Sequence, residues 1–388
     1  MLPYGRQEVS AEDEAAVVAA LHAEHLTQGP GVARFEAALA ERVGARHAVA
    51  FNSGTAALHA AYAAAGIGPG RTVLTSPITF AATANAARYL GGDARFADID
   101  AATGLLCPVA TAAALDASVR VLAPVHLTGE VADLDALGRL ACTNGLVVVE
   151  DAAHALGAEW TDAGGRRRRI GDCSHSAMCC FSFHPVKHIT TGEGGAVTTN
   201  DAGLARALRR FRTHGITRDP AELEADEGPW YYEQHELGFN YRLPDLNCAL
   251  GASQLARLDA IVSRRRALRD RYARRLAPLA DVRLLARPAW SAGSVHLVVV
   301  QVAAAARRPA FEALRAAGIG VNVHYLPVYR HPYWRRTGFA TMHLPNAEAY
   351  YAGAITLPCW PGMADADVDR AVEALAAALA TPGTRAAA

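Results

Sequence analysis

Continuous apolar runs of strand length are the feature that most restricts how this chain can fold. Residues 119–125 and 146–150 are mainly apolar and rich in valine and leucine, as in parallel strands that are buried on both faces of a sheet. Helical patterns occur between such runs, so strands and helices alternate along the chain. This alternation predicts an α/β fold with a mostly parallel central sheet and helices on both of its faces.

The expected elements divide the chain into two units. Ser10 is the expected N-cap of a first helix over residues 11–24. Further helices are expected over 32–43, 80–89, 202–214, 246–275, 309–317 and 365–379, and further strands over 47–51, 73–75, 94–97, 295–302 and 320–325. We expect the domain boundary near residue 250, with a large α/β domain over 1–250 and a smaller α+β domain over 251–388. The stretch 219–234 is predicted to be a loop or flap, and 381–388 to be disordered.

The charge balance argues against two classes of partner. Lys plus Arg and Asp plus Glu both number 38, so the formal net charge is zero. No strong field therefore directs the chain to nucleic acid or to a membrane surface. Two basic runs, 166–169 and 264–266, lack interleaved aromatic residues and are predicted to be solvated, the first at a hairpin tip.

Cysteine usage and hydropathy indicate the compartment. The seven cysteines form no C-x-x-C pair, which argues against a disulfide framework, and Cys179 and Cys180 are predicted to be small buried side chains. No apolar stretch is long enough to span a bilayer, and the N-terminus lacks the pattern of a signal peptide. We therefore expect a reduced, soluble protein of the cytoplasm.

Lys187 is the residue that most narrows the chemistry. It lies between the apolar segment 181–183 and the glycine-rich turn 192–195. Partial burial lowers the pKa of a lysine amine, which could then form a Schiff base with pyridoxal phosphate. The alternative is a surface lysine at a turn, but lysine is scarce in this chain, which favours the functional interpretation.

Asp151 is the predicted partner of the pyridine nitrogen of this cofactor. It follows the apolar run 146–150, and ligands of open α/β sheets bind at the carboxyl ends of the strands. A carboxylate there would keep the ring nitrogen protonated, although an acidic residue at this place can also cap a helix. His154 would pack on the ring or reach its phenolic oxygen, unless it is a core histidine bonded to backbone.

The phosphate of the cofactor has a candidate cradle at residues 52–58, where small residues and a hydroxyl open a helix after a strand. A plain helix cap has the same appearance. Ser182 offers a second hydroxyl. Phe80, at the end of the next strand, could stack on the pyridine ring, whereas an ordinary core aromatic is the alternative.

Together these residues resemble the DegT/DnrJ/EryC1/StrS sugar aminotransferases, a group of fold-type I enzymes similar to aspartate aminotransferase. The likeness extends over nearly the whole chain. It rests on residues 3–7, 26–30, 52–59, 77–85, 96–100, 125–129, 150–155, 181–195, 212–216 and 238–244. The run Phe-His-Pro-Val-Lys that ends at Lys187 looks most like the branch that aminates UDP-linked 4-keto-6-deoxy sugars on the way to pseudaminic acid.

The resemblance implies a role for each matching position. Lys187 would carry the Schiff base, Asp151 would pair with the pyridine nitrogen, and Phe80 would stack on the ring. The implied phosphate ligands are Ser182 and the backbone of Gly54, Thr55 and Ala56, together with Asn240 for the phosphate in the neighbouring subunit. The family therefore implies a homodimer with shared active sites. His154 stands where many relatives have glutamine, so its contact with the cofactor stays open.

The sugar side is less well determined by the sequence. The resemblance implies a pocket lined by the N-terminal segment and the flap. The candidate substrate-binding residues are Tyr4, Gln28, His184, Arg218, His324 and Tyr325. A diphosphate on the substrate would favour arginine partners, and Arg218 and Arg330 are the candidates.

The predicted function is therefore a pyridoxal-phosphate-dependent aminotransferase. By resemblance, it would move an amino group from L-glutamate or L-glutamine to a ketone of a nucleotide-linked keto-deoxysugar. One alternative is an acceptor such as a keto-cyclitol or another natural-product ketone. A second is a pyridoxal-dependent sugar dehydratase, in which family members have histidine in place of the lysine. A third is a binding or regulatory module that keeps the fold without catalysis.

Overall fold

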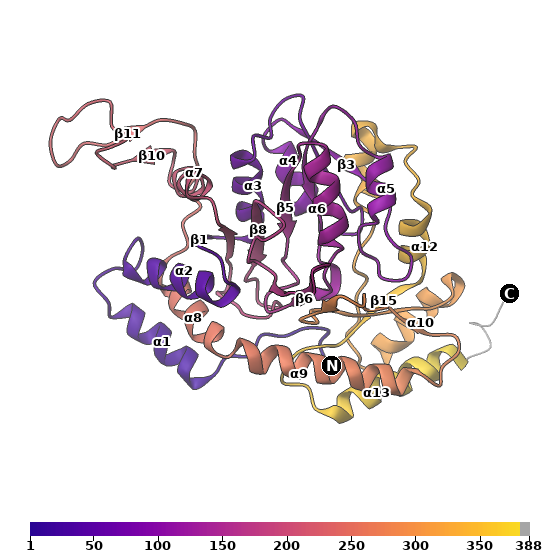
Figure 1. Ribbon diagram of the computed structural model, residues 1–388. Helices are drawn as coiled ribbons and strands as arrows, with labels where there is room; N and C mark the ends of the chain where they lie inside the picture. Colours follow the sequence, from indigo (N-terminus) through magenta and orange to yellow (C-terminus); the bar gives the residue numbers. More distant parts are fainter. Residues whose placement is uncertain (381–388) are drawn as a thin grey trace.

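In the computed structural model, which describes residues 1–380, the largest element is a seven-stranded sheet with the order β1-β9-β8-β5-β4-β2-β3 (Figure 1). Its strands are β1 (His47–Phe51), β2 (Thr72–Thr75), β3 (Asp93–Phe96), β4 (Val119–Ala123), β5 (Val147–Asp151), β8 (Met178–Ser182) and β9 (Gly195–Thr199). Neighbouring strands are parallel, except that β9 is antiparallel to both β1 and β8. The prediction of a mostly parallel sheet is confirmed. The tail 381–388, predicted to be disordered, lies outside the described residues.

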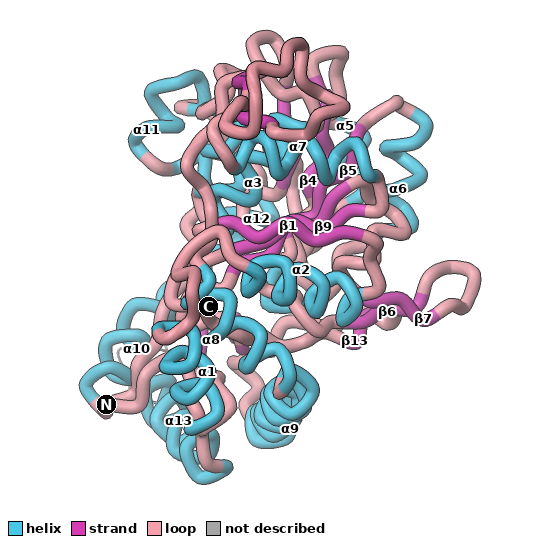
Figure 2. The backbone as a smooth tube through the Cα atoms, turned by 90° about the vertical axis from the view of Figure 1, so that its left-hand side faces the viewer, coloured by secondary structure: helices cyan, strands magenta, loops and turns pink. Residues whose placement is uncertain are grey.

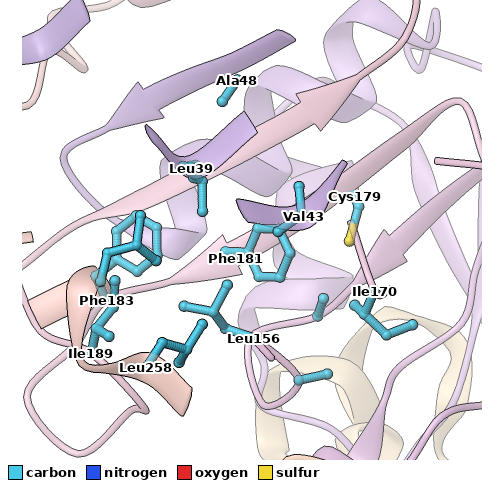
Figure 3. Packing of buried hydrophobic residues seen from close by; sticks show 14 of the residues in the cluster. Leu39, Val43, Ala48, Leu156, Ile170, Cys179, Phe181, Phe183, Ile189 and Leu258 are labelled. Atoms are coloured by element: carbon cyan, nitrogen blue, oxygen red, sulfur yellow. The ribbon is translucent and has the colours of Figure 1, made fainter. Parts of the chain in front are cut away.

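Helices cover both faces of this sheet (Figure 2). They are α2 (Pro30–Val43), α3 (Gly54–Ala64), α4 (Ala82–Arg88), α5 (Pro108–Ala113), α6 (Leu134–Thr143) and α7 (Ala202–Arg212). Side chains alternate along a strand, so one face, which includes Val49 and Val197, packs against α3, α4 and α7. The other face packs against α2 and α6. Figure 3 shows Phe181 of β8 beside Leu39 and Val43 of α2.

A smaller α+β unit follows. Its sheet has the order β12-β14-β15, with antiparallel pairs throughout. The elements of this part are α8 (Asp245–Ala256), α9 (Leu258–Leu276), β12 (Arg283–Leu284), β14 (Val298–Gln301), α10 (Ala304–Ala316), α12 (Pro345–Gly353), β15 (Ala354–Leu357) and α13 (Asp365–Ala380). The single helix expected over 246–275 is two helices that meet at Arg257. A domain boundary near residue 250 stays a prediction.

The strand predicted over 320–325 does not form, because its backbone pairs with two different partners. The Gly320 N–H donates to the Leu2 carbonyl (2.7 Å). Two residues later, Asn322 exchanges backbone hydrogen bonds with Thr356 of β15. One hydrogen-bonded residue pair with each partner is too few to form a β-strand. This stretch therefore runs between the N-terminal segment and β15 without regular secondary structure.

Short elements complete the fold. They are α1 (Ala11–Leu21), the sheet of β6 (Glu159–Thr161), β7 (Arg167–Arg169) and β13 (Ser291–Ala292), the hairpin of β10 (Ile216–Thr217) and β11 (Glu233–Gln234), 3-10 turns at Leu127–Gly129 and Val328–Arg330, α11 (Pro332–Trp334) and a π turn at Arg335–Phe339. The β10–β11 hairpin projects from the body (Figure 1), as predicted for a flap. No helix in the described part of the chain is both long and apolar enough to cross a membrane.

The two basic runs differ in their environment. The side chains of Arg167 and Arg169 are mostly exposed, as predicted, but they lie in the strand β7 beside the hairpin tip, and Arg168 is 27% exposed and bonds to Asp162. The prediction of solvated arginines at 264–266 is wrong. Arg264 bonds to Asp365. The side chain of Arg265 is buried, because α9 packs with this residue toward the carbonyl groups of the loop before β14.

Asp13, in the first turn of α1, does more than complete the helix cap. Ser10 is the N-cap, as predicted, and its N–H donates to Asp13 Oδ2 (2.9 Å). The buried carboxylate also accepts from Ser253 Oγ (2.6 Å), Gln254 Nε2 (2.7 Å) and Arg257 Nη2 (2.5 Å). Burial opposes ionisation, but these hydrogen bonds outweigh it and lower the pKa of Asp13. Asp13 therefore fastens α1 to the junction of α8 and α9.

Replacing Asp13 with alanine should lower the free energy of unfolding by about 2–3 kcal/mol, because the donors of three side chains lose their acceptor. Urea unfolding at a fixed protein concentration measures this change. Glu14→Ala removes an exposed carboxyl from the next position and should change the value by less than about 0.5 kcal/mol. Equal stability of the two variants would contradict the fastening role.

Candidate active site

The carboxyl edge of the central sheet carries Asp151. This residue ends β5 and is 5% exposed. Its Oδ1 accepts from the Ala153 N–H (3.1 Å), and its Oδ2 accepts from the Thr83 hydroxyl (2.6 Å). The second carboxylate oxygen is thus held by α4, and the group is oriented from two sides. A buried carboxylate fixed in this way can hold a proton on a ring nitrogen.

Lys187 lies in the turn after β8, where its N–H donates to the His184 carbonyl (2.9 Å). Burial lowers the pKa of Lys187 to about 8, with a further lowering by Arg265, while the carboxylate of Asp151 acts in the opposite direction. A substantial fraction of the amine is therefore neutral near physiological pH and can attack a carbonyl. Lys187 is also the only lysine in the sequence, so no other ε-amine competes for an aldehyde.

The start of α3 forms a cradle beside Ser182. Ser53 is the N-cap, and its Oγ accepts from the Ala56 N–H (3.1 Å). In the described part of the chain, the N–H groups of Gly54 and Thr55 have no acceptor. The start of α3 passes close to Ser182, since a Cβ built on Gly54 would lie 2.9 Å from the Ser182 Cβ. The Ser182 hydroxyl and the free N–H groups of Gly54 and Thr55 therefore lie beside the same space. These three groups suit a phosphate. The Ala56 N–H is not free to bind one, because it donates to Ser53 Oγ.

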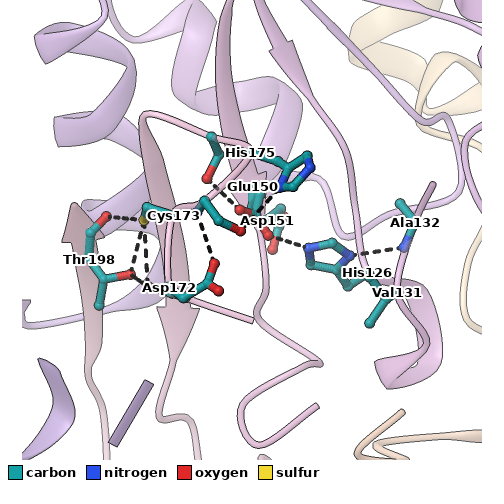
Figure 4. Close-up of polar contacts among 12 residues, drawn as sticks. His126, Val131, Ala132, Glu150, Asp151, Asp172, Cys173, His175 and Thr198 are labelled. Carbon is teal, nitrogen blue, oxygen red and sulfur yellow. Dashed lines mark hydrogen bonds and ion pairs between the residues drawn. The ribbon is translucent and has the colours of Figure 1, made fainter. Parts of the chain in front are cut away.

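A buried hydrogen-bond chain lies behind Asp151 (Figure 4). His126 Nδ1 accepts from the Ala132 N–H (3.1 Å), so its Nε2 carries the proton and donates to Glu150 Oε2 (2.8 Å). The other oxygen of Glu150 accepts from the Ser176 hydroxyl. The His126 N–H donates to the Asp151 carbonyl (3.1 Å). This chain fixes the backbone from which the Asp151 side chain projects.

Aromatic and imidazole rings form one wall of the site. His154 Nε2 is 3.0 Å from the Tyr325 hydroxyl, and the two rings are nearly parallel. His154 Nδ1 is buried without a partner. The neighbouring His324 bonds to Thr356 (2.9 Å) and packs against Tyr4, with ring centroids 5.4 Å apart. Burial lowers the pKa of His154 and of His324, that of His324 to about 4, so both imidazoles are neutral.

Three further predicted residues lie exposed around the site. Phe80 is 62% exposed, with its ring centroid 6.4 Å from that of Tyr325, as expected if one ring face awaits a ligand. Asn240 is exposed, and its carbonyl accepts from Asn52 Nδ2 (3.3 Å) next to the cradle. His184 is exposed in the lysine turn.

Other candidate residues are not brought to Lys187 within this chain. Gln28 lies exposed in the turn between α1 and α2, with φ 59°. Arg218 stacks on Tyr232 in the projecting β10–β11 hairpin. Arg330 bonds to Glu348 (3.0 Å). Their roles in substrate binding stay predictions.

The site residues fit pyridoxal phosphate. A reactive amine, a buried carboxylate, a cradle with free donors and an exposed ring lie at one edge of the sheet. The unpartnered Nδ1 of His154 adds a polar atom that lacks a hydrogen bond in the protein. The sequence did not reveal Thr83 as the partner of Asp151, although it lies one turn after Phe80 within the conspicuous run 77–85.

Comparisons with known proteins agree with this geometry. The sequence matches the DegT/DnrJ/EryC1/StrS aminotransferase family over residues 7–376. It is 38% identical over 385 residues to the spore coat polysaccharide biosynthesis protein SpsC of Bacillus subtilis (strain 168). The alignment covers 96% of this chain and 96% of SpsC.

Two solved structures extend the comparison. One is Helicobacter pylori PseC, an aminotransferase involved in the biosynthesis of pseudoaminic acid, with TM-score 0.89, 29% identity, and 97% of this chain and 98% of that chain covered. The other is the PLP form of Spr1654 from Streptococcus pneumoniae, with TM-score 0.89, 26% identity, and 97% and 98% covered. The fold type and the cofactor predicted from the sequence are thereby confirmed. The chain belongs to the DegT/DnrJ/EryC1/StrS family and is a pyridoxal-phosphate-dependent aminotransferase.

Proposed function

We propose that the enzyme moves an amino group from L-glutamate, or L-glutamine, to a ketone of a nucleotide-linked keto-deoxysugar. The observation that carries the reaction is the reactive amine of Lys187 in the field of Asp151 at the sheet edge. The names of SpsC and PseC, from polysaccharide and pseudoaminic acid biosynthesis, support a sugar acceptor. Tyr4, His324 and Tyr325 supply hydroxyl and imidazole groups that can bond to sugar hydroxyls.

We also infer that the enzyme works in the cytoplasm. All seven cysteines are free, and five of them are buried. Free thiols are typical of proteins from a reducing compartment.

The chain's own residues divide the work of the transfer. With pyridoxal phosphate bound, Lys187 Nζ would take the proton from the Cα of the amino donor and hold it for return. Asp151 keeps the ring nitrogen protonated, and Thr83 keeps Asp151 in place. Pyridoxal phosphate, when bound, accepts the electron pair of the broken Cα–H bond. In the second half-reaction the same groups act in reverse order on the acceptor ketone.

A set of acceptors tests the proposed substrate. With L-glutamate, a UDP-linked 4-keto-6-deoxyhexose should yield equal amounts of 2-oxoglutarate and amino sugar, measured by mass spectrometry. Lys187→Ala should give no turnover, because the amine that moves the proton is lost. Transfer to a keto-inositol but not to the nucleotide sugar would overturn the sugar proposal in favour of a cyclitol acceptor. Loss of water from the sugar without consumption of glutamate would indicate a dehydratase.

Thr83→Val should raise the Kd for pyridoxal phosphate roughly 10-fold or more, since a hydrogen bond to a buried carboxylate contributes about 1.5–3 kcal/mol. Titration of the apoenzyme with the cofactor, followed by absorbance, measures this. Thr83→Ser keeps the hydroxyl and should bind nearly as the wild type does. If the valine and serine variants bind equally, Thr83 does not orient Asp151.

We further propose a homodimer in which Asn240 of one chain reaches the cofactor phosphate of its partner. Asn240 is exposed in the single chain, beside Asn52. Nearby, Phe239 (39% exposed) and Tyr89 (57% exposed) pack around the buried ring of His59. Exposed aromatic side chains of this kind are typical of interfaces.

Mixing two inactive variants tests this arrangement. Lys187→Ala removes the amine, and Asn240→Asp sets a carboxylate against a phosphate. If Asn240 acts on the partner's cofactor, a mixed dimer has one intact site, so a refolded 1:1 mixture should regain about a quarter of wild-type activity. If Asn240 acts within its own chain, no site is intact and the mixture should remain as inactive as its components.

A further inference from the structure

Arg265, in the middle of α9, is a buried cation with no carboxylate partner among the described residues. It is 1% exposed, and its Nε has no hydrogen-bond partner. Its guanidinium donates only to carbonyl groups: Nη1 to Cys359 (2.9 Å), His296 (3.2 Å) and Val295 (3.4 Å), and Nη2 to Val186 (3.5 Å). An ion buried without a counter-ion costs free energy, so the charge of Arg265 calls for an explanation beyond packing.

The neighbouring arginines of α9 have acidic groups nearby. Arg264 bonds to Asp365 (2.9 Å). Arg266 also donates to carbonyl groups of the loop before β14, but Glu159 and Glu130 lie close enough to favour its charge. Arg265 is therefore unusual within its own run, although all three residues share one helix.

The charge of Arg265 lies directly behind the lysine turn. One of its acceptors is the carbonyl of Val186, the residue before Lys187. The residue after the lysine, His188, is bonded through Nε2 to the Ser294 carbonyl (3.1 Å), in the same loop that supplies Arg265 with acceptors. Arg265 thus contacts the lysine turn, the loop before β14 and the end of β15 at once.

Most of the other titratable groups around Lys187 and Arg265 are neutral. They are His154, His188, His296, His324, Tyr325, Cys359 and Tyr272. Burial lowers the pKa of the four histidines and raises the pKa of the tyrosines and the thiol, so none carries a charge near pH 7. Arg6 and Glu8, which line the small space beside the lysine turn, are exposed and of opposite sign. Two buried ions remain, Asp151 and Arg265.

We propose that Arg265 is a positioning residue for amino transfer: its uncompensated charge increases the fraction of Lys187 that is in the neutral form, the form that attacks a carbonyl. A positive charge in a buried region of low dielectric constant repels the protonated amine. Asp151 attracts it, and this carboxylate is needed for the cofactor, so a second ion of opposite sign offsets this attraction and adds to the effect of burial. The proposal rests on Lys187 as the reacting amine and is independent of the acceptor.

A purely structural role would have a different consequence. Four hydrogen bonds from Arg265 could simply join three segments of backbone. In that case, replacing the arginine would lower the stability of the fold and leave the protonation of Lys187 unchanged. The titration of the Lys187 amine therefore distinguishes the two roles.

The test is the pH dependence of Lys187 acetylation by acetic anhydride in the apoenzyme. Because the chain has one lysine, mass spectrometry of a single peptide reports the reaction. We expect half-maximal reactivity at pH about 8 in the wild type. Arg265→Gln and Arg265→Met should raise this midpoint by about one pH unit or more, because the repelling charge is gone.

Arg266→Gln is the matched control, since it removes the same charge and two carbonyl contacts one residue away. Its midpoint should equal that of the wild type. A folded neutral variant of Arg265 that titrates like the wild type overturns the proposal. So does failure of both neutral variants to fold, which would assign Arg265 to packing. The assay contains neither cofactor nor sugar, so its outcome does not depend on whether the keto-sugar proposal holds.

Discussion

A carboxylate buried at the end of a parallel strand is the constraint on which this active site depends. Asp151 is largely shielded from water where it lies, so protein dipoles must stabilise its charge. Thr83 and the N–H of Ala153 do this from two directions. The surrounding groups respond: burial, together with this charge, raises the pKa of Tyr325. The strand that carries Asp151, the start of α4 and the neutral rings of the wall thus all accommodate the charge of Asp151.

The candidate site was found from short runs of the sequence. Lys187 between an apolar segment and glycines, and Asp151 after a run of valines, were predicted from local patterns, because the carboxyl ends of parallel strands meet at one edge. Strands β1 to β5 were placed within a few residues, because each is a short, mainly apolar run, whereas β8 and β9 were not predicted as strands. The partners of these residues were not predicted. Thr83 is 68 residues from Asp151 in the chain, and no local pattern connects them.

The errors have a common physical cause. The run 264–266 looks like a solvated basic face, but Arg265 is buried by contacts with backbone carbonyl groups, which no side-chain pattern encodes. Asp13 was not singled out by the sequence, because the three side chains that donate to it, in α8 and at the α8–α9 junction, lie far away along the chain. The stretch 320–325 has the composition of a strand but divides its backbone bonds between two partners.

The backbone contact between Asn52 and Tyr241 has a thermodynamic consequence. The Asn52 N–H donates to the Tyr241 carbonyl (2.9 Å), so the cradle of one chain and the segment proposed to reach the partner's phosphate are held together. In such a dimer each cofactor is bound by both chains. Linkage then requires that the cofactor tighten dimer association by the same factor by which association tightens cofactor binding. Dissociation of the subunits would therefore weaken cofactor binding, so dilution would favour the release of pyridoxal phosphate.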